Sequence, residues 1–259
     1  MSECARKDGS CRRCEAPLDF DFTMAFQPIV DLAARRVVGY EALVRGVNGE
    51  SAASILNQVD KKRLYRFDQQ CRTQALRLAH RLGLEGRLSI NFLPNAVYDP
   101  QACIQSTLEA AAEVGWSVQR ICFEITESED VTDKAHLQEI VNAYRDYGFV
   151  VALDDFGTGF ANLDLLVDLQ PDLLKIDRRF VTDIDRDPRR QAIVTGMLGM
   201  ARDMRIDTIA EGIETAGEAQ WLFAAGITRH QGYFYARPGL ESLPVCTPSQ
   251  FEEARGDSG

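Results

Sequence analysis

Short apolar runs alternate with amphipathic segments along the chain from about residue 22 onward. Eight runs have the length and composition of β-strands. They cover residues 23–30, 36–45, 87–92, 121–126, 149–155, 173–177, 206–212 and 226–228. Between several of them, apolar residues recur at i, i+3 and i+4, which is the spacing of a helix with one buried face. This spacing predicts helices over 55–82, 104–114, 135–147 and 192–204.

Repeated alternation of strands and helices is typical of βαβ units and of a parallel sheet. Eight strands in about 230 residues predict an α/β fold, a TIM-like (β/α)₈ barrel. A doubly wound open sheet is the structural alternative. The first two strands differ from the rest, because only DLAAR (31–35) joins them. A parallel crossover needs a dozen or more residues, so we expect this pair to be an antiparallel hairpin within the barrel.

The pattern divides the chain into three parts, an N-terminal arm (1–21), the predicted barrel domain (22–250) and a C-terminal tail (251–259). The arm carries Cys4, Cys11 and Cys14 within CARKDGSCRRC. Three thiols at this spacing could bind zinc or act as a redox pair. A disordered or simply packed arm is the third alternative, and the sequence leaves the choice open.

Composition excludes some classes of partner. The net charge of −10 argues against binding of duplex nucleic acid through a general basic face. The start of the chain, MSECARKDGS, has no apolar segment typical of a signal peptide. No uncharged apolar run approaches the roughly 18–20 residues of a membrane span. We therefore expect a cytoplasmic protein that does not enter a membrane and keeps its cysteines mostly reduced.

Polar residues lie at the carboxyl end of nearly every predicted strand. In a barrel of this type these ends converge on one face. The residues are Glu41, Arg45, Asn91, Glu124, Glu127, Asp154, Asp155, Lys175, Asp177, Glu211, Glu214 and Gln231. Oxygen donors that converge with few basic residues form a site for hard divalent cations, and Mg²⁺ or Mn²⁺ fits best. The alternative is that single strand ends simply face water.

Two adjacent aspartates, Asp154 and Asp155, end an apolar run and open the segment DDFGTGF. Burying two like charges is costly unless a positive charge lies close to both. Asp154 is placed to bridge two ions while Asp155 binds the second. Sites with two ions about 3.5–4 Å apart commonly serve phosphoester hydrolysis. The pattern therefore predicts a two-metal centre of that kind.

These residues occur in a series of motifs that resembles the EAL-type cyclic-di-GMP phosphodiesterases over roughly residues 22–245. In order, the motifs are EALVRG with Glu41-Ala42-Leu43, SINFLP, FEITE, DDFGTG, LKID, AEGIET and QGYFYARP. The resemblance implies a barrel whose first strand pair is antiparallel. It also implies hydrolysis of one phosphodiester of cyclic di-GMP to linear pGpG, which lowers a bacterial second messenger. Two Mg²⁺ or Mn²⁺ ions per site and a homodimer are implied as well.

The resemblance also gives individual residues their expected roles. Ligands of the first metal are Glu41, Asn91, Glu124 and Asp154. Ligands of the second are Asp154, Asp155 and Glu211. The two catalytic residues are Lys175, which positions the attacking water, and Glu211, which is also a candidate to take its proton. Groups that hold the DDFGTG loop are Glu127 and Glu214. Substrate contacts are Arg45 and Gln231, with Gln27, Leu43 and Asp177 as weaker candidates.

Some relatives of this kind lack metal ligands and act as receptors for the dinucleotide or as protein–protein regulators. None of the expected acidic ligands is missing from this chain, and Lys175 is present. One departure is FANLDLL (160–166), where relatives often carry a small hydroxylic pair. We expect it to alter loop packing and not metal binding. Hydrolysis is therefore the expected activity, with the receptor and the regulator as alternatives.

Overall fold

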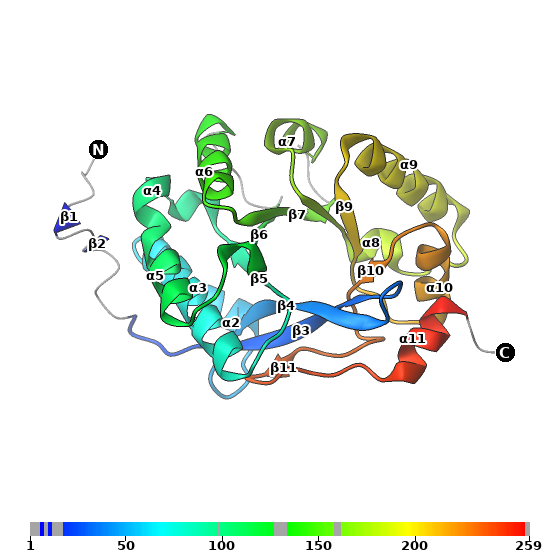
Figure 1. Ribbon diagram of the computed structural model, residues 1–259, viewed down its shortest axis with the longest axis horizontal. Helices are drawn as coiled ribbons and strands as arrows, with labels where there is room; N and C mark the ends of the chain where they lie inside the picture. The colour runs from blue at the N-terminus through cyan, green and yellow to red at the C-terminus, as the bar shows by residue number, and fades with distance from the viewer. Residues whose placement is uncertain are drawn as a thin grey trace.

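The computed structural model describes residues 6–7, 10–11, 18–97, 99–126, 134–157 and 162–256. In this part of the chain, eight strands form a closed barrel surrounded by helices (Figure 1). The barrel strands are β3 (Thr23–Asp31), β4 (Arg36–Arg45), β5 (Arg87–Phe92), β6 (Ile121–Thr126), β7 (Val150–Phe156), β8 (Leu173–Ile176), β9 (Asp207–Ala210) and β10 (Arg229–His230). Each strand pairs with the next, and β10 pairs with β3. The predicted barrel is confirmed, and the open-sheet alternative is wrong.

The first strand of the barrel runs against both of its neighbours. β3 is antiparallel to β4 and to β10, whereas β4 through β10 are parallel to one another. The expected hairpin is therefore confirmed. β10 pairs with only the last residues of β3, and the short strand β11 (Gly239–Leu240) pairs with Ala25 and Phe26 near its start. Two short strands thus share one edge of β3.

Helices follow most of the strands and cover the outside of the barrel (Figure 1). They are α2 (Ala52–Leu56), α3 (Leu64–Arg81), α4 (Pro100–Cys103), α5 (Gln105–Glu113), α6 (Lys134–Asp146), α7 (Asn162–Leu169), α8 (Arg178–Val181), α9 (Pro188–Met204), α10 (Ala216–Ala224) and α11 (Pro248–Arg255). Two 3₁₀ turns, η1 (Pro94–Ala96) and η2 (Val118–Arg120), and two short N-terminal strands, β1 (Arg6–Lys7) and β2 (Ser10–Cys11), complete the elements.

The helix predicted over 55–82 is two helices. α2 ends at Leu56, and α3 begins at Leu64. In the intervening turn the Asp60 carboxylate accepts hydrogen bonds from the backbone N–H groups of Lys62 and Arg63. These bonds stabilise the turn that separates the two helices, and α3 begins after it with Arg63 as its N-cap residue. The predicted helices over 135–147 and 192–204 are confirmed as α6 and α9.

An apolar layer fills the barrel and forms the floor of its carboxyl-terminal end. The layer consists of Ile29, Cys122, Ala152, Leu173 and Ile209, all buried. In β6 to β9 each of these residues lies two positions before a polar residue that the sequence singles out. Because strand side chains alternate with period two, those polar residues point into the barrel just above the layer. The fold therefore brings them together on one side of an apolar floor.

Two sequence expectations change near the C-terminus. The eighth strand is Arg229–His230 and not 226–228, because Gly226 has a φ of 102° in the turn that ends α10. The predicted tail boundary at residue 251 falls within α11, where Phe251 and Ala254 are buried in the core. The predicted tail, 251–259, therefore overlaps the second half of this helix.

Other expectations for the N-terminal arm remain open. Cys4, Cys14 and the side chain of Cys11 lie outside the described residues. Across the ranges that the structure describes, no helix combines the length and the apolar character needed to cross a bilayer.

Candidate metal centre

Four carboxylates converge on one lysine at the carboxyl end of the barrel. The Lys175 Nζ, on β8, lies 2.7 Å from Glu124 Oε2 and 2.7 Å from Glu211 Oε1. It lies 3.2 Å from Asp154 Oδ1 and 3.3 Å from Glu41 Oε2. The lysine has no exposed surface. The structure thus brings together five predicted site residues from β4, β6, β7, β8 and the segment after β9.

Side-chain amides from neighbouring strands fix the Glu41 carboxylate. The Asn91 Nδ2 donates to Glu41 Oε1 at 2.8 Å, and the Gln231 Nε2 donates to Glu41 Oε2 at 2.7 Å. Gln231 also donates to Gln27 Oε1 at 3.3 Å, and Gln27 donates to the carbonyl of Ala236. Gln27 lies directly opposite Glu41 in the β3–β4 pair. Residues of β3, of β5 and of the segment directly after β10 therefore orient this carboxylate.

A local distortion of β7 sets the position of Asp155. Regular alternation would send Asp154 and Asp155 to opposite faces of the strand. Asp155 has a φ of 53°, and the β7–β8 register shifts between Leu153 and Phe156. The Asp155 N–H donates to Asp154 Oδ1 at 2.8 Å. A left-handed non-glycine residue is uncommon and is a feature of constrained functional sites.

The carboxylates form two overlapping groups of oxygen donors. Glu41, Glu124 and Asp154 each offer an oxygen within 4.8 Å of the others. Asp154, Asp155 and Glu211 form a second group by the same measure. Asp154 belongs to both, as expected for a carboxylate that bridges two ions. The grouping matches the two ligand sets that the sequence predicts, with Asn91 beside the first set.

Charge in this cluster is unevenly compensated. Burial disfavours the ammonium of Lys175, but the surrounding carboxylates, Asp154 foremost, raise its pKa well above the ordinary value. Burial likewise works against an ionised Glu41, yet Lys175 and the amides of Gln231 and Asn91 together lower its pKa. The lysine and this one glutamate therefore stay charged as a pair.

Burial and neighbouring carboxylates raise the pKa of three other carboxyl groups in the cluster. Burial raises the pKa of Glu124 to about 8, since Lys175 offsets only part of the desolvation and of the repulsion from neighbouring carboxylates. Burial and the charge of Asp154 raise the pKa of Glu211 well above its usual range. Burial, Asp154 and a neighbouring aspartate raise the pKa of Asp155 to about 6. One ammonium is too little positive charge for this many carboxylates.

The donor set fits a hard divalent cation. Among the described residues, the buried Glu124 Oε1 has no hydrogen-bond partner. A buried carboxylate oxygen without a partner is rare in folded proteins, because no hydrogen bond offsets the free-energy cost of removing it from water. Oxygen donors with no thiol or imidazole among them suit Mg²⁺ or Mn²⁺. Divalent cations would supply the positive charge that the cluster lacks.

A cavity of about 190 Å³ opens beside the cluster. Its lining consists of Gln27, Glu41, Asp155, Asp177, Arg178, Glu211, Gly212, Glu214, Gln231, Gly232 and Tyr233. Asp177 also caps α8, because its carboxylate accepts the N–H of Arg179 at 2.9 Å. The sequence did not single out Arg178 or Tyr233. Both could have been found from their positions, one directly after LKID and the other within QGYFYARP.

Two predicted substrate contacts do not line this cavity. Leu43 and Arg45 follow Glu41 on the same face of β4, but they are not among the described residues that line this cavity. The Arg45 Nη1 donates to the carbonyl of Val44. Glu214 has a carboxylate oxygen 3.8 Å from the Arg178 Nη2. Glu127 lies outside the described residues, as do residues 158–161 of the DDFGTG loop and its continuation.

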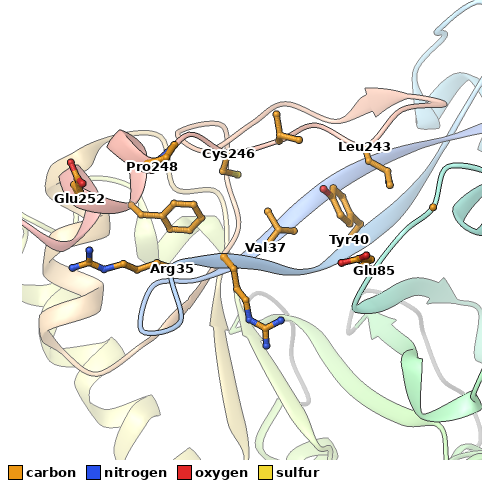
Figure 2. A pocket seen from close by; sticks show the side chains of 12 residues that line it. Arg35, Val37, Tyr40, Glu85, Leu243, Cys246, Pro248 and Glu252 are labelled. Carbon is orange, nitrogen blue, oxygen red and sulfur yellow. The ribbon is translucent and has the colours of Figure 1, made fainter.

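A larger cavity, of about 520 Å³, holds none of the predicted site residues. Figure 2 shows it between β4 and the C-terminal segment, with Val37, Tyr40 and Cys246 on its walls. The Tyr40 hydroxyl donates to the carbonyl of Pro244 at 3.0 Å across it. Size alone does not identify the functional site, because neither group of acids found among the described residues lies here. Members of both groups line the smaller cavity.

Comparison with protein families gives a match over most of the chain. The model described as the EAL domain matches residues 15–238. The blue light- and temperature-regulated antirepressor BluF of Escherichia coli is 32% identical over 221 residues, 85% of this chain and 55% of the relative. The cyclic di-GMP phosphodiesterase PA2567 of Pseudomonas aeruginosa is 29% identical over 240 residues, 90% of this chain and 40% of the relative. The chain thus spans about half or less of these relatives.

Solved structures share the fold closely. A standalone versatile EAL protein from Vibrio cholerae, in its c-di-GMP bound form, has a TM-score of 0.88 at 48% sequence identity. The match covers 90% of this chain and 99% of that chain. The manganese and cyclic diGMP complex of Klebsiella pneumoniae BlrP1 has a TM-score of 0.82 at 33% identity, covering 89% of this chain and 60% of that chain.

Proposed function

The chain belongs to the EAL domain family, and from its carboxylate cluster we propose that it hydrolyses cyclic di-GMP to linear pGpG with two Mg²⁺ or Mn²⁺ ions. The observation that carries the proposal is the pair of oxygen groups that share Asp154. The unpartnered Glu124 Oε1 supports it independently. Further support comes from the relative named as a cyclic di-GMP phosphodiesterase and from the structural neighbour solved with manganese and the dinucleotide.

In this proposal each group of donors holds one cation. The first ion would be held by Glu41, Asn91, Glu124 and Asp154. The second would be held by Asp154, Asp155 and Glu211. Bound divalent cations would withdraw charge from the phosphodiester and make a water molecule more acidic.

The chain's own residues then position and deprotonate the attacking water. Lys175 is buried and held by four carboxylates, so its N–H groups have fixed directions. A donor held in this way stabilises developing negative charge without reorganising. Glu211 lines the cavity, and its Oε1 lies 2.7 Å from the Lys175 Nζ, so its carboxylate is placed beside the lysine to accept the water proton. We assign these roles to Lys175 and Glu211.

Substrate contacts are proposed for polar residues of the cavity wall. Gln27, Asp177 and Gln231 line it and offer hydrogen-bonding groups to a guanine edge. Arg178 also lines it, and its guanidinium suits a phosphate oxygen. Arg45 and Leu43, further along β4, are proposed as outer contacts. Glu127 and Glu214 remain the proposed positioning groups for the DDFGTG loop.

A homodimer is part of the same proposal. Leu163 and Val167 lie one turn apart on α7, and their exposed fractions are 57% and 62%. Ile193 and Met200 on α9 are 45% and 37% exposed. The two helices follow the adjacent strands β7 and β8. Exposed apolar side chains on neighbouring helices favour a protein–protein contact. Light scattering should give twice the chain mass for the protein and the chain mass for Leu163→Asp.

The nucleotide assay tests the activity. Protein and cyclic di-GMP are incubated with Mg²⁺, and the nucleotides are separated by chromatography. We expect pGpG from the protein and from the control Glu139→Ala, whose side chain is 75% exposed on α6. Glu41→Ala should lose at least about a hundredfold of the rate, as for removal of one preorganised group. Binding without pGpG would favour a receptor, and no binding would favour a protein–protein regulator.

A further inference from the structure

A second charged cavity lies at the opposite, amino-terminal end of the barrel. Its volume is about 420 Å³. It is formed where β4 and β5 begin, beside η2 and β10. Four arginines line it, against one acidic residue, Asp31, among the described lining residues. The arginines are Arg36, Arg87, Arg120 and Arg229.

Strand register explains why arginines distant in the sequence meet here. Asp31, the last residue of β3, pairs with Arg36 on one side and with Arg229 on the other. Arg87 pairs with Gly39 where β5 runs beside β4. Closure of the barrel thus places three arginine-bearing strands around a single carboxylate. The arrangement is fixed by backbone pairing and does not depend on flexible loops.

Two of the guanidinium groups are held in place by the protein. The Arg120 side chain donates to the carbonyls of Gly86 and Leu84 at 2.9 and 2.7 Å, and it lies 3.9 Å above the ring of Trp116. The Arg229 Nη1 lies 2.7 Å from Asp207 Oδ2. These groups keep their orientation without a ligand, which lowers the entropic cost of binding one.

The other two guanidinium groups lack such partners. Among the described residues, neither Arg36 nor Arg87 forms an ion pair or a side-chain hydrogen bond. Asp31 accepts the N–H groups of Ala33 and Ala34 with one oxygen, so part of its charge serves its own turn. Because Arg229 is paired with Asp207, three guanidinium groups face the one carboxylate of the described lining, in a chain whose net charge is −10. Like charges that line one cavity repel one another, and an anion bound between them removes this repulsion.

The cavity is separate from the metal centre. Its inner wall includes Ile29 and Val38. Ile29 belongs to the apolar layer that fills the barrel, and Val38 packs against that layer. The carboxylate cluster lies on the other side of the same layer. A ligand bound at the arginines would not touch the residues proposed for hydrolysis.

We propose that this arginine cavity binds an anion that carries phosphate groups. Guanidinium groups bind phosphate oxygens in pairs, and four of them from separate elements suit more than one phosphate group. The volume lies within the range of small-molecule sites. The class of ligand is a pyrophosphate or a nucleotide with two phosphates. The proposal is independent of the proposed hydrolysis.

Calorimetric titration tests the proposal. The protein is kept in EDTA, so that the metal centre holds no divalent ion, and is titrated at constant ionic strength with pyrophosphate and, separately, with ADP. We expect saturable binding with one site per chain. Binding of both probes assigns the site to phosphate groups, and binding of ADP alone assigns it to a nucleotide. Binding of neither probe overturns the proposal.

Variants locate the binding. Arg36→Gln combined with Arg87→Gln should weaken binding at least tenfold. The matched control is Arg77→Gln combined with Arg186→Gln, whose side chains are 53% and 80% exposed and do not line the cavity. It removes the same charge and should leave the affinity within twofold. Equal weakening in both pairs would mean a general charge effect and would overturn the assignment. Circular dichroism of each variant establishes that it is folded.

Discussion

Replacing Lys175 by methionine removes the ammonium group that four carboxylates share. Methionine has a similar length and fills the same buried space, so the change tests charge more than volume. In the absence of divalent cations the variant leaves Glu41, Glu124, Asp154 and Glu211 without their common partner. We expect the folded state to lose stability in EDTA.

The size of the loss follows from burial. Lys175 has no exposed surface, and two of its carboxylate oxygens lie at 2.7 Å. Removing one partner from a buried ion pair costs about 3–5 kcal/mol. For a chain of this size, each kcal/mol lowers the midpoint of thermal unfolding by about 2–4 °C. The midpoint of Lys175→Met in EDTA should therefore lie roughly 6–20 °C below that of the unmodified protein.

Divalent cations should reverse most of this loss. A cation that binds only the folded state stabilises it, by about 2.7 kcal/mol at a hundred times its dissociation constant. Because the variant has more uncompensated charge, Mn²⁺ should raise its unfolding midpoint more than that of the unmodified protein. Hydrolysis should nevertheless remain lost. Lys134→Met is the control, since the Lys134–Asp164 pair is exposed and such pairs contribute about 0–1 kcal/mol.

Differential scanning calorimetry in EDTA and in excess Mn²⁺ measures both effects. The reasoning is refuted if Lys175→Met unfolds within about 2 °C of the unmodified protein in EDTA. It is refuted equally if Mn²⁺ raises both midpoints by the same amount, because the cation would then not compensate the same carboxylates.

Further predictions concern residues outside the cluster. Burial lowers the pKa of His230 to about 4, below its usual 6.5, so the unfolded chain binds more protons between these values and stability falls as pH falls through this range. This loss of unfolding free energy should reach about 3 kcal/mol. The difference in unfolding free energy between the protein and His230→Asn, measured with urea, should therefore become smaller from pH 7 to pH 4.5. A difference that stays constant contradicts the reasoning. Gly39→Ala places a Cβ 2.5 Å from the carbonyl oxygen of Arg87 and should cost about 1–3 kcal/mol in the same assay, so an unchanged midpoint would contradict the close packing of β4 and β5. The Asp187 carboxylate caps α9 by accepting the Arg189 N–H at 2.9 Å. Asp187→Ala should therefore lower the free energy of unfolding by about 1 kcal/mol. Asp203→Ala, near the end of the same helix, should leave this free energy unchanged.

The strands could be predicted because each carries a continuous apolar run between turns. Residues 23–30 and 121–126 are buried throughout or nearly so, and their composition alone indicates strands. The strand predicted at 226–228 was wrong, because Ile227 is buried but belongs to the turn before β10. Helix breaks such as the one at Asp60 depend on a single side chain that accepts backbone N–H groups. Periodicity does not detect them.

The candidate site could be predicted where strand ends determine position. Residues such as Glu124 and Lys175 each follow an apolar floor residue by two positions, so the barrel fixes where they point. Arg178 was missed because an arginine after a strand also suits a solvent-exposed helix start. The left-handed conformation of Asp155 could not be predicted from the sequence either, because an aspartate does not require it.

The carboxylate cluster joins distant parts of the polypeptide, because Gln231 Nε2 hydrogen-bonds a carboxylate on β4 that lies 190 residues earlier. During translation, the β3–β4 hairpin emerges before the rest of the barrel, and its two-residue partner β10 is made only after the other barrel strands. Nascent chains that stop short of Arg229 leave one side of β3 unpaired, and exposed strand edges promote association between chains. Chaperone binding to ribosome-bound intermediates should therefore persist until this late strand has left the exit tunnel.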